Sequence, residues 1–164
     1  MILMSIDAST KATGVAIFDE GKLIHYECLY ENDANVLNRI SNMTDRLISL
    51  AIEYKINEVA LEDVMPNDVK HNQQIYTVLM YLQGSIALAL NKIHLKINKL
   101  FVASNWRKIV GIKTGRGVYR ETLKKSSMKL VKDHYNIDVN DDVADAVCIG
   151  IAYLKETEDN YQWE

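Results

Sequence analysis

The chain has 164 residues and a formal net charge of −3, with 48% hydrophobic and 25% charged residues. This length and composition are typical of one soluble domain with a substantial core, and they exclude a mainly disordered protein. No run approaches the roughly 18 apolar residues of a membrane span, and no signal-peptide pattern opens the sequence, so we expect neither a membrane partner nor secretion.

Apolar runs and turn signals predict alternating strands and helices. In chain order, the expected elements are strands over 2–6, 13–18 and 23–30, a helix over 34–54, a strand over 59–61, a helix over 69–91, a strand within 96–103, and helices over 105–110, 119–135 and 139–154. Gly21 marks a hairpin turn, and Ser104 is expected to cap the short helix that follows it. The pattern predicts an α/β fold with a mixed sheet, in one domain over residues 1–154 followed by a polar tail over 155–164.

The expected helix over 69–91 contains "IYTVLMYLQGSIALAL", which is too uniformly hydrophobic for a helix with one solvent-facing side. We expect this helix to be buried on more than one side, as in a subunit interface. The two cysteines, Cys28 and Cys148, are too few for a disulfide framework or a zinc site, so we expect buried thiols in a reducing cytoplasm.

Acidic residues stand at the ends of the expected buried elements. Asp7 ends the first apolar run, and Glu62 ends the fourth strand. Asp142 and Asp145 lie three residues apart at the start of the last helix, a spacing that places both on one helix face. Because sites in α/β sheets gather beyond the carboxyl ends of strands, we expect the four carboxylates to converge.

Such a convergence predicts a metal site, because clustered like charges are tolerated mainly around a cation. Oxygen ligands suit Mg²⁺, with Mn²⁺ able to substitute, and two ions about 3.5–4 Å apart would activate a water and stabilise the leaving oxygen of a phosphodiester. Taken singly, Asp7 could form a turn, and Asp141 or Asp142 could cap a helix, but neither interpretation explains the joint pattern. Asp63 and Asp141 could be mistaken for ligands; Asp63 is expected on the opposite face of its strand.

Positive charge is concentrated in one segment. Between residues 92 and 132 the sequence has twelve Lys or Arg residues and a single acid, Glu121, so the segment carries +11 and the remainder −14. This separation predicts a surface that binds a polyanion, although any single lysine could simply solvate a helix. "GIKTGRG" within the segment predicts a mobile basic loop.

These residues resemble the RuvC family of Holliday-junction resolvases, within the RNase H-like nuclease superfamily, over nearly the whole chain. "IDASTKATGVAIF" is similar to the family's opening strand, acid and second strand, "EVALEDV" to its second acidic strand, and "DDVADAVCIGIA" to its closing acidic helix. The resemblance implies an RNase H-like fold with a mixed five-stranded sheet flanked by helices. It also implies two Mg²⁺ ions per site and catalytic, metal-ligating roles for Asp7, Glu62, Asp142 and Asp145.

The resemblance also implies partners. "QQIYTVLMYLQGSIALALN" is similar to a homodimer-interface helix, and "RKIVGIKTGRGVYRETLKK" to a junction-binding region. The residues expected to contact DNA are Met65, Arg107, Lys108, Lys113, Arg116, Arg120, Lys124 and Lys125.

The sequence departs from the family at two points. Ala8 and Ser9 stand where the family usually has Pro-Gly, and Met65 stands where bacterial members place an aromatic residue beside the junction centre. Methionine stacks on bases less well, which puts sequence-selective cleavage in doubt. The divergence and compactness are similar to bacteriophage-encoded members, which act without the bacterial branch-migration partners.

The expected function is a metal-dependent, structure-selective DNA endonuclease of recombination and repair. It would resolve four-way junctions, and possibly related forks, by paired cleavage, in a bacterial cytoplasm (that of the host, if the protein is phage-encoded). Three alternatives remain open: another RNase H-like nuclease that acts on RNA–DNA hybrids or flaps, a junction-binding protein without catalysis, and an ATP-binding domain of the actin or sugar-kinase type. The last normally requires two such domains, for which 164 residues are too few.

Overall fold

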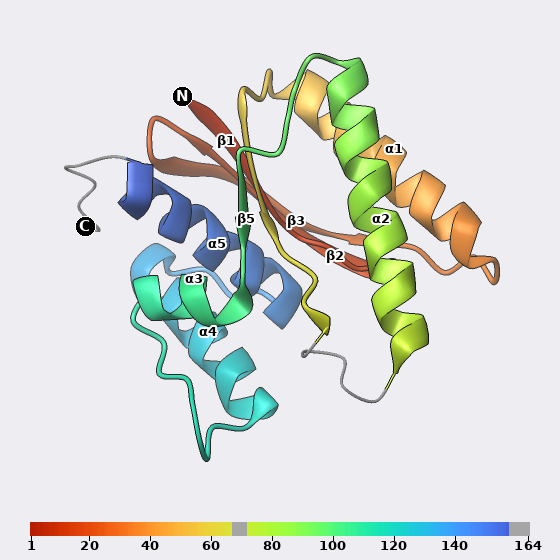
Figure 1. Ribbon diagram of the computed structural model, residues 1–164. Coiled ribbons are helices and arrows are strands. Elements are labelled where there is room, and N and C mark those ends of the chain that lie inside the picture. The colour runs from red at the N-terminus through yellow and green to blue at the C-terminus, as the bar shows by residue number, and fades with distance from the viewer. Residues whose placement is uncertain (67–71, 158–164) are drawn as a thin grey trace.

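The computed structural model describes residues 1–66 and 72–157, which form one sheet covered by helices on both faces (Figure 1). The strands are β1 (Ile2–Asp7), β2 (Ala12–Asp19), β3 (Lys22–Tyr30), β4 (Glu58–Glu62) and β5 (Lys99–Phe101). The helices are α1 (Val36–Glu53), α2 (Gln73–Lys92), α3 (Ala103–Ile109), α4 (Arg120–Tyr135) and α5 (Asp141–Thr157). No helix within these residues is long and apolar enough to cross a membrane.

The sheet has the order β3-β2-β1-β4-β5. β1, β2 and β3 form an antiparallel meander, whereas β4 pairs with both β1 and β5 in parallel. The expected mixed five-stranded sheet is therefore confirmed. Parallel pairing matters for function because it brings the carboxyl ends of β1 and β4 to the same edge of the sheet.

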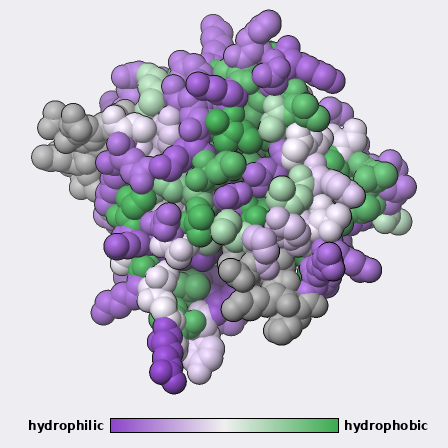
Figure 2. Space-filling model, in the orientation of Figure 1, coloured by the Kyte–Doolittle hydropathy of each residue, from purple (hydrophilic) through white to green (hydrophobic). Residues whose placement is uncertain are grey.

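Alternating side chains of β1 show how the two faces are covered. Leu3 packs in the core beneath α3, α4 and α5, whereas Met4 and Ile6 pack in the core beneath α1 and α2. Figure 2 shows one side of the molecule, where hydrophilic residues are interspersed with apolar patches. The domain is a three-layer α/β/α structure with the sheet in the middle.

α5 is the central helix of its layer, and its packing is unusually close. The Ser5 hydroxyl, buried in β1, donates to the backbone carbonyl of Ala146 at 2.8 Å. A Cβ on Gly150 would lie 2.2 Å from Cε2 of Phe18 and 2.7 Å from the Ser5 oxygen. Only a glycine therefore allows α5 to lie this close to β1 and β2.

Several sequence-based boundaries need correction. Ser104 does not cap the short helix: α3 begins one residue earlier, Val102 occupies the capping position, and no side chain bonds the first turn. α5 continues through Thr157, so residues 155–157 of the expected tail are helical. The expected start of α2 at residues 69–71 and the tail over 158–164 lie outside the described residues.

Candidate active site

The candidate active site begins at the paired ends of β1 and β4. Ile6 pairs with Leu61 across the two parallel strands, so the next residues, Asp7 and Glu62, end neighbouring strands at the same edge. Asp7 lies two residues after Ser5, which contacts α5, and strand alternation places it on the same face.

Asp63, the neighbour that could be mistaken for a ligand, lies on the other face. Its Oδ1 accepts a hydrogen bond at 3.4 Å from Gln83 Nε2 of α2, a helix that covers the opposite face from α5. The expectation that Asp63 points away from the carboxylate site is therefore confirmed. Alternation along β4 leaves Glu62 as the acid that faces α3 and α5.

α5 brings the second pair of acids to this edge. Gly14 of β2 pairs with Asp7 of β1, and a Cβ on Gly14 would lie 1.9 Å from the backbone oxygen of Asp142. The first turn of α5 thus lies directly on the strand beside Asp7. Asp145 follows one turn later, partly buried with 14% of its side chain exposed. The helix is capped by Asn140, whose side-chain oxygen accepts from the Val143 amide at 3.0 Å.

The Asp7 carboxyl is buried and lies within electrostatic reach of the other three acids. Burial is the first cause that raises the pKa of the Asp7 carboxyl well above its ordinary value. The negative charges of Glu62, Asp145 and Asp142 raise the pKa further. Arg107 is the cation that opposes the rise. The other three acids thus each disfavour the ionisation of Asp7, and their role as metal ligands stays a prediction.

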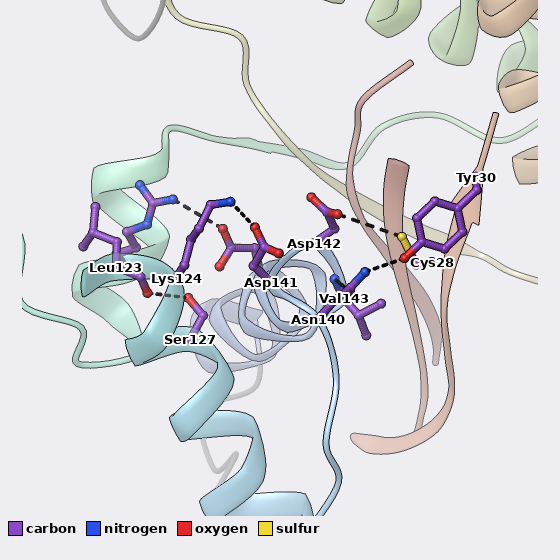
Figure 3. A network of polar contacts seen from close by, with 11 residues as sticks. Cys28, Tyr30, Leu123, Lys124, Ser127, Asn140, Asp141, Asp142 and Val143 are labelled. Atoms are coloured by element: carbon purple, nitrogen blue, oxygen red, sulfur yellow. Dashed lines mark hydrogen bonds and ion pairs between the residues drawn. The ribbon is translucent and has the colours of Figure 1, made fainter. Parts of the chain in front are cut away.

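The two acids at the start of α5 differ in surroundings. Asp141 forms an ion pair with Lys124 of α4, whose Nζ lies 2.5 Å from Oδ2 of Asp141. The hydrogen bond that Lys124 donates lowers the pKa of Asp141. Asp142 is turned instead toward Cys28 of β3, with Sγ and Oδ2 4.0 Å apart (Figure 3). Burial, and then the charge of Asp141, raises the pKa of Asp142. Of these two acids, Asp142 is the one whose charge raises the pKa of Asp7.

α3 contributes two side chains that hold the other acids. The indole Nε1 of Trp106 donates to Oε2 of Glu62 at 2.6 Å, and the Trp106 side chain is fully buried. Arg107 lies over the Trp106 ring, with its Cζ 4.5 Å from the ring centroid, and its Nη2 lies 3.5 Å from Oδ2 of Asp145. Burial raises the pKa of Asp145, and the Ser127 hydroxyl and then Arg107 oppose that rise.

Carboxylate oxygens are suitable ligands for a hard divalent cation, but two of the four acids here contact other side chains of the protein. Within residues 1–66 and 72–157, no three Asp, Glu, His or Cys side chains are gathered closely enough to form a complete metal site. Trp106 holds Glu62, and Arg107 lies beside Asp145. Oδ1 of Asp145 is nevertheless buried and makes no hydrogen bond to the described chain, which is the condition of an oxygen that lacks its ligand. Asp7, Glu62, Asp142 and Asp145 could hold Mg²⁺ or Mn²⁺ through oxygen atoms alone.

The basic residues predicted to contact DNA fall into two groups. Exposed side chains on α3, the following loop and α4 form the basic surface: Lys108, Lys113, Arg116, Arg120 and Lys125. Arg107 and Lys124 instead pair with Asp145 and Asp141 at the edge of the site. Met65, partly buried, lies just after β4.

The basic loop has a backbone that requires its glycines. Gly111, Gly115 and Gly117 have φ values of 86°, 125° and 85°, a region that other residues rarely adopt. The loop connects α3, which carries Trp106 and Arg107, to α4, which carries Lys124.

Sequence reasoning missed three residues at this site. Trp106 carried no recognisable signal, because a tryptophan in an amphipathic helix usually indicates core packing. Gly14 did carry one, since an isolated glycine within a strand marks close backbone approach. Cys28 was expected to be buried, as Cys148 is, but it is only partly buried and faces Asp142.

Structural comparison gives the fold a name. No protein-family model matches the chain, and no curated protein matches it in sequence. The structure is similar to RuvC of Thermus thermophilus in complex with a Holliday junction substrate, with a TM-score of 0.75, 12% identity and coverage of 96% of each chain. A second structure of Thermus thermophilus RuvC gives a TM-score of 0.71 at 14% identity, over 95% of this chain and 96% of the other.

A more distant neighbour is the yeast mitochondrial Holliday junction resolvase Ydc2. It gives a TM-score of 0.56 at 12% identity, over 96% of this chain and 81% of the other. At such identities the likeness concerns the fold. The chain therefore has the RuvC fold, and the expected RNase H-like architecture is confirmed.

Proposed function

We propose that the protein is a metal-dependent, structure-selective endonuclease that resolves Holliday junctions and related branched DNA by paired phosphodiester cleavage. One observation carries the proposal: within a RuvC fold, Asp7 lies in the combined field of Glu62, Asp142 and Asp145. One of the RuvC structures with which the chain shares this fold is in complex with a Holliday junction substrate. The proposed location is a bacterial cytoplasm, that of the host if the protein is phage-encoded.

The four carboxylates would hold two Mg²⁺ ions, or Mn²⁺ in their place. When bound, such ions supply an activated water and charge stabilisation at a phosphodiester. The protein supplies the rest: Asp7 and Glu62 stand at the ends of two paired strands, which hold the two carboxylates in place. Arg107 lies 3.5 Å from Asp145 and its charge also acts on Asp7, so it could contact the negative phosphate.

The exposed basic side chains would bind the DNA backbone. Lys113 and Arg116 project from the loop between α3 and α4, and Arg120 opens α4. Contacts of this kind position the substrate without reading its sequence, so we propose selection by junction shape. Met65 would lie closest to the branch point, where a flexible apolar side chain can wedge between bases but stacks weakly.

A homodimer would match the two-fold symmetry of a four-way junction and place two sites on opposite strands. The supporting observation is the outer face of α2, where Tyr81 is 58% and Leu88 is 70% exposed. These side chains are two turns apart on one helix face. Large exposed apolar side chains in such a row are typical of an interface.

Cleavage of a labelled synthetic four-way junction tests the proposal, with matched duplex, fork and RNA–DNA hybrid as control substrates. Each substrate is incubated with Mg²⁺, Mn²⁺ or chelator, using the natural protein and Asp7→Asn. We expect metal-dependent paired nicks on the junction that disappear in Asp7→Asn while junction binding persists. Binding without cleavage under every condition would make the protein a binding module, and cleavage of the hybrid alone would make it a ribonuclease.

A further inference from the structure

We propose that Trp106 is a positioning residue that orients Glu62 for metal binding through its indole N–H. This inference rests on the proposed function, because it assigns Glu62 a metal. It adds a residue that the sequence pattern did not single out. It also gives α3 a role in the metal site that is separate from DNA binding.

The geometry of the pair is specific. Nε1 of Trp106 and Oε2 of Glu62 are 2.6 Å apart, a short hydrogen bond between groups from α3 and β4. The Trp106 side chain is completely buried and is among the largest fully buried side chains of the core. Its packing fixes the ring, so the direction of the N–H is fixed as well.

The indole has chemical properties that suit this role. It is a donor only, and when buried it requires an acceptor, so the Trp106–Glu62 bond satisfies both partners. It is also neutral, and it therefore holds one carboxylate oxygen without cancelling the negative charge of Glu62. A lysine or arginine in its place would compete with a metal cation for that charge. The hydrogen bond from Trp106 thus orients Glu62.

Asp145 provides the contrast within the same site. Its Oδ2 has a cation, Arg107, at a loose 3.5 Å, and its Oδ1 makes no hydrogen bond to the described chain. Arg107 in turn rests on the face of the Trp106 ring. Trp106 therefore organises two acids in different ways: it bonds Glu62 through its edge and supports the partner of Asp145 with its face.

The substitution Trp106→Phe separates the two contributions, because phenylalanine keeps an aromatic face for Arg107 and removes only the N–H donor. Groups that hydrogen-bond metal ligands typically contribute 10–100-fold to metal affinity. We expect Trp106→Phe to bind Mn²⁺ about tenfold more weakly than the natural protein, with four-way-junction affinity in chelator unchanged. Mn²⁺ binding is measured by electron paramagnetic resonance of the free ion, which does not require cleavage. Equal Mn²⁺ affinity of the two proteins would overturn the proposal.

A second measurement leaves Trp106 intact and so does not depend on whether Trp106→Phe folds. The sequence has two tryptophans, and Trp163→Phe leaves Trp106 as the single indole. We expect its ¹H–¹⁵N signal to shift as Mg²⁺ is added, and not to shift when Asp7→Asn is added to the same background. An indole signal unaffected by Mg²⁺, in a protein that binds Mn²⁺ through Asp7, overturns the role of Trp106 alone. If the protein does not bind Mn²⁺, or if Asp7→Asn leaves Mn²⁺ binding unchanged, both the proposed metal site and the role of Trp106 are overturned.

Discussion

Gly14 and Asp142 are in direct backbone contact: the carbonyl oxygen of Asp142 lies 1.9 Å from where a Cβ on Gly14 would stand. Because Gly14 pairs with Asp7, this contact fixes the distance between β1 and the first turn of α5. The position of Asp142 relative to Asp7 thus depends on the lack of a side chain at Gly14. The same principle operates at Gly150, farther along α5.

Gly14→Ala is predicted to push α5 away from the sheet. The neighbouring atoms are backbone and cannot rotate aside, so we expect the free energy of unfolding to fall by about 1–3 kcal/mol. We also expect weaker metal binding, because the shift moves Asp142 and Asp145 away from Asp7. Thermal unfolding and Mn²⁺ binding measure the two effects. Gly84→Ala is the control, since nothing lies within 4 Å of its Cβ position. Equal stability of Gly14→Ala and Gly84→Ala would contradict the close contact.

Asp7→Asn is predicted to stabilise the metal-free protein at neutral pH. The folded state raises the pKa of Asp7, so it retains a proton that the unfolded state has already lost. The stability that protonated Asp7 contributes is fully present below its pKa in the unfolded state. It is lost as the pH rises through the pKa of Asp7 in the folded state. Each pKa unit of the rise corresponds to about 1.4 kcal/mol, and Asp7→Asn removes this pH-dependent loss.

Chemical denaturation in chelator between pH 4 and roughly 8 measures this difference. The two stability curves should diverge as pH increases, with Asp7→Asn the more stable protein. Added Mg²⁺ should then stabilise the natural protein more than the variant. Parallel curves in chelator would show that Asp7 is not in a strongly anionic, buried site.

Arg116→Gln tests the basic surface. Loss of one phosphate contact should make the salt dependence of junction binding less steep by about one unit of log K against log salt, with little dependence on DNA sequence. The control is Lys99→Gln, which removes an equal charge from β5, where Lys99 pairs with Glu156 at 2.8 Å. Fluorescence anisotropy over a range of salt concentrations gives both slopes. Identical slopes for the two variants would remove the loop from the DNA interface.

Leu88→Asp is predicted to weaken self-association. A charge at the centre of an apolar contact is costly to bury, so we expect a dimer Kd at least about tenfold higher, or about 1.4 kcal/mol. Sedimentation velocity measures the effect. Ile24→Asp, on the edge strand β3 and 50% exposed, is the matched control. A natural protein that sediments as a monomer at micromolar concentration would contradict the dimer directly.

The order of elements and the convergence of the acids could be predicted because both depend on local pattern. Asp7 and Glu62 end apolar runs, and Asp142 and Asp145 share a helix face, so strand alternation and helical spacing were sufficient. The Trp106–Glu62 bond could not be predicted, since it joins residues 44 positions apart through a specific side-chain direction. Arg107 and Lys124 were assigned to DNA from charge and from the family resemblance. Their pairing with Asp145 and Asp141 depends on how α3 and α4 pack.

The most direct test of the central claim is the product formed from a supercoiled plasmid with an extruded cruciform. Two cuts within one binding event convert this plasmid to a linear molecule, whereas independent cuts release a nicked circle first. The carboxylate site on a two-fold dimer predicts linear product with Mg²⁺, and intact supercoiled plasmid with chelator or with Asp7→Asn. Nicked circle as the main product, or cleavage that persists in Asp7→Asn, would contradict it.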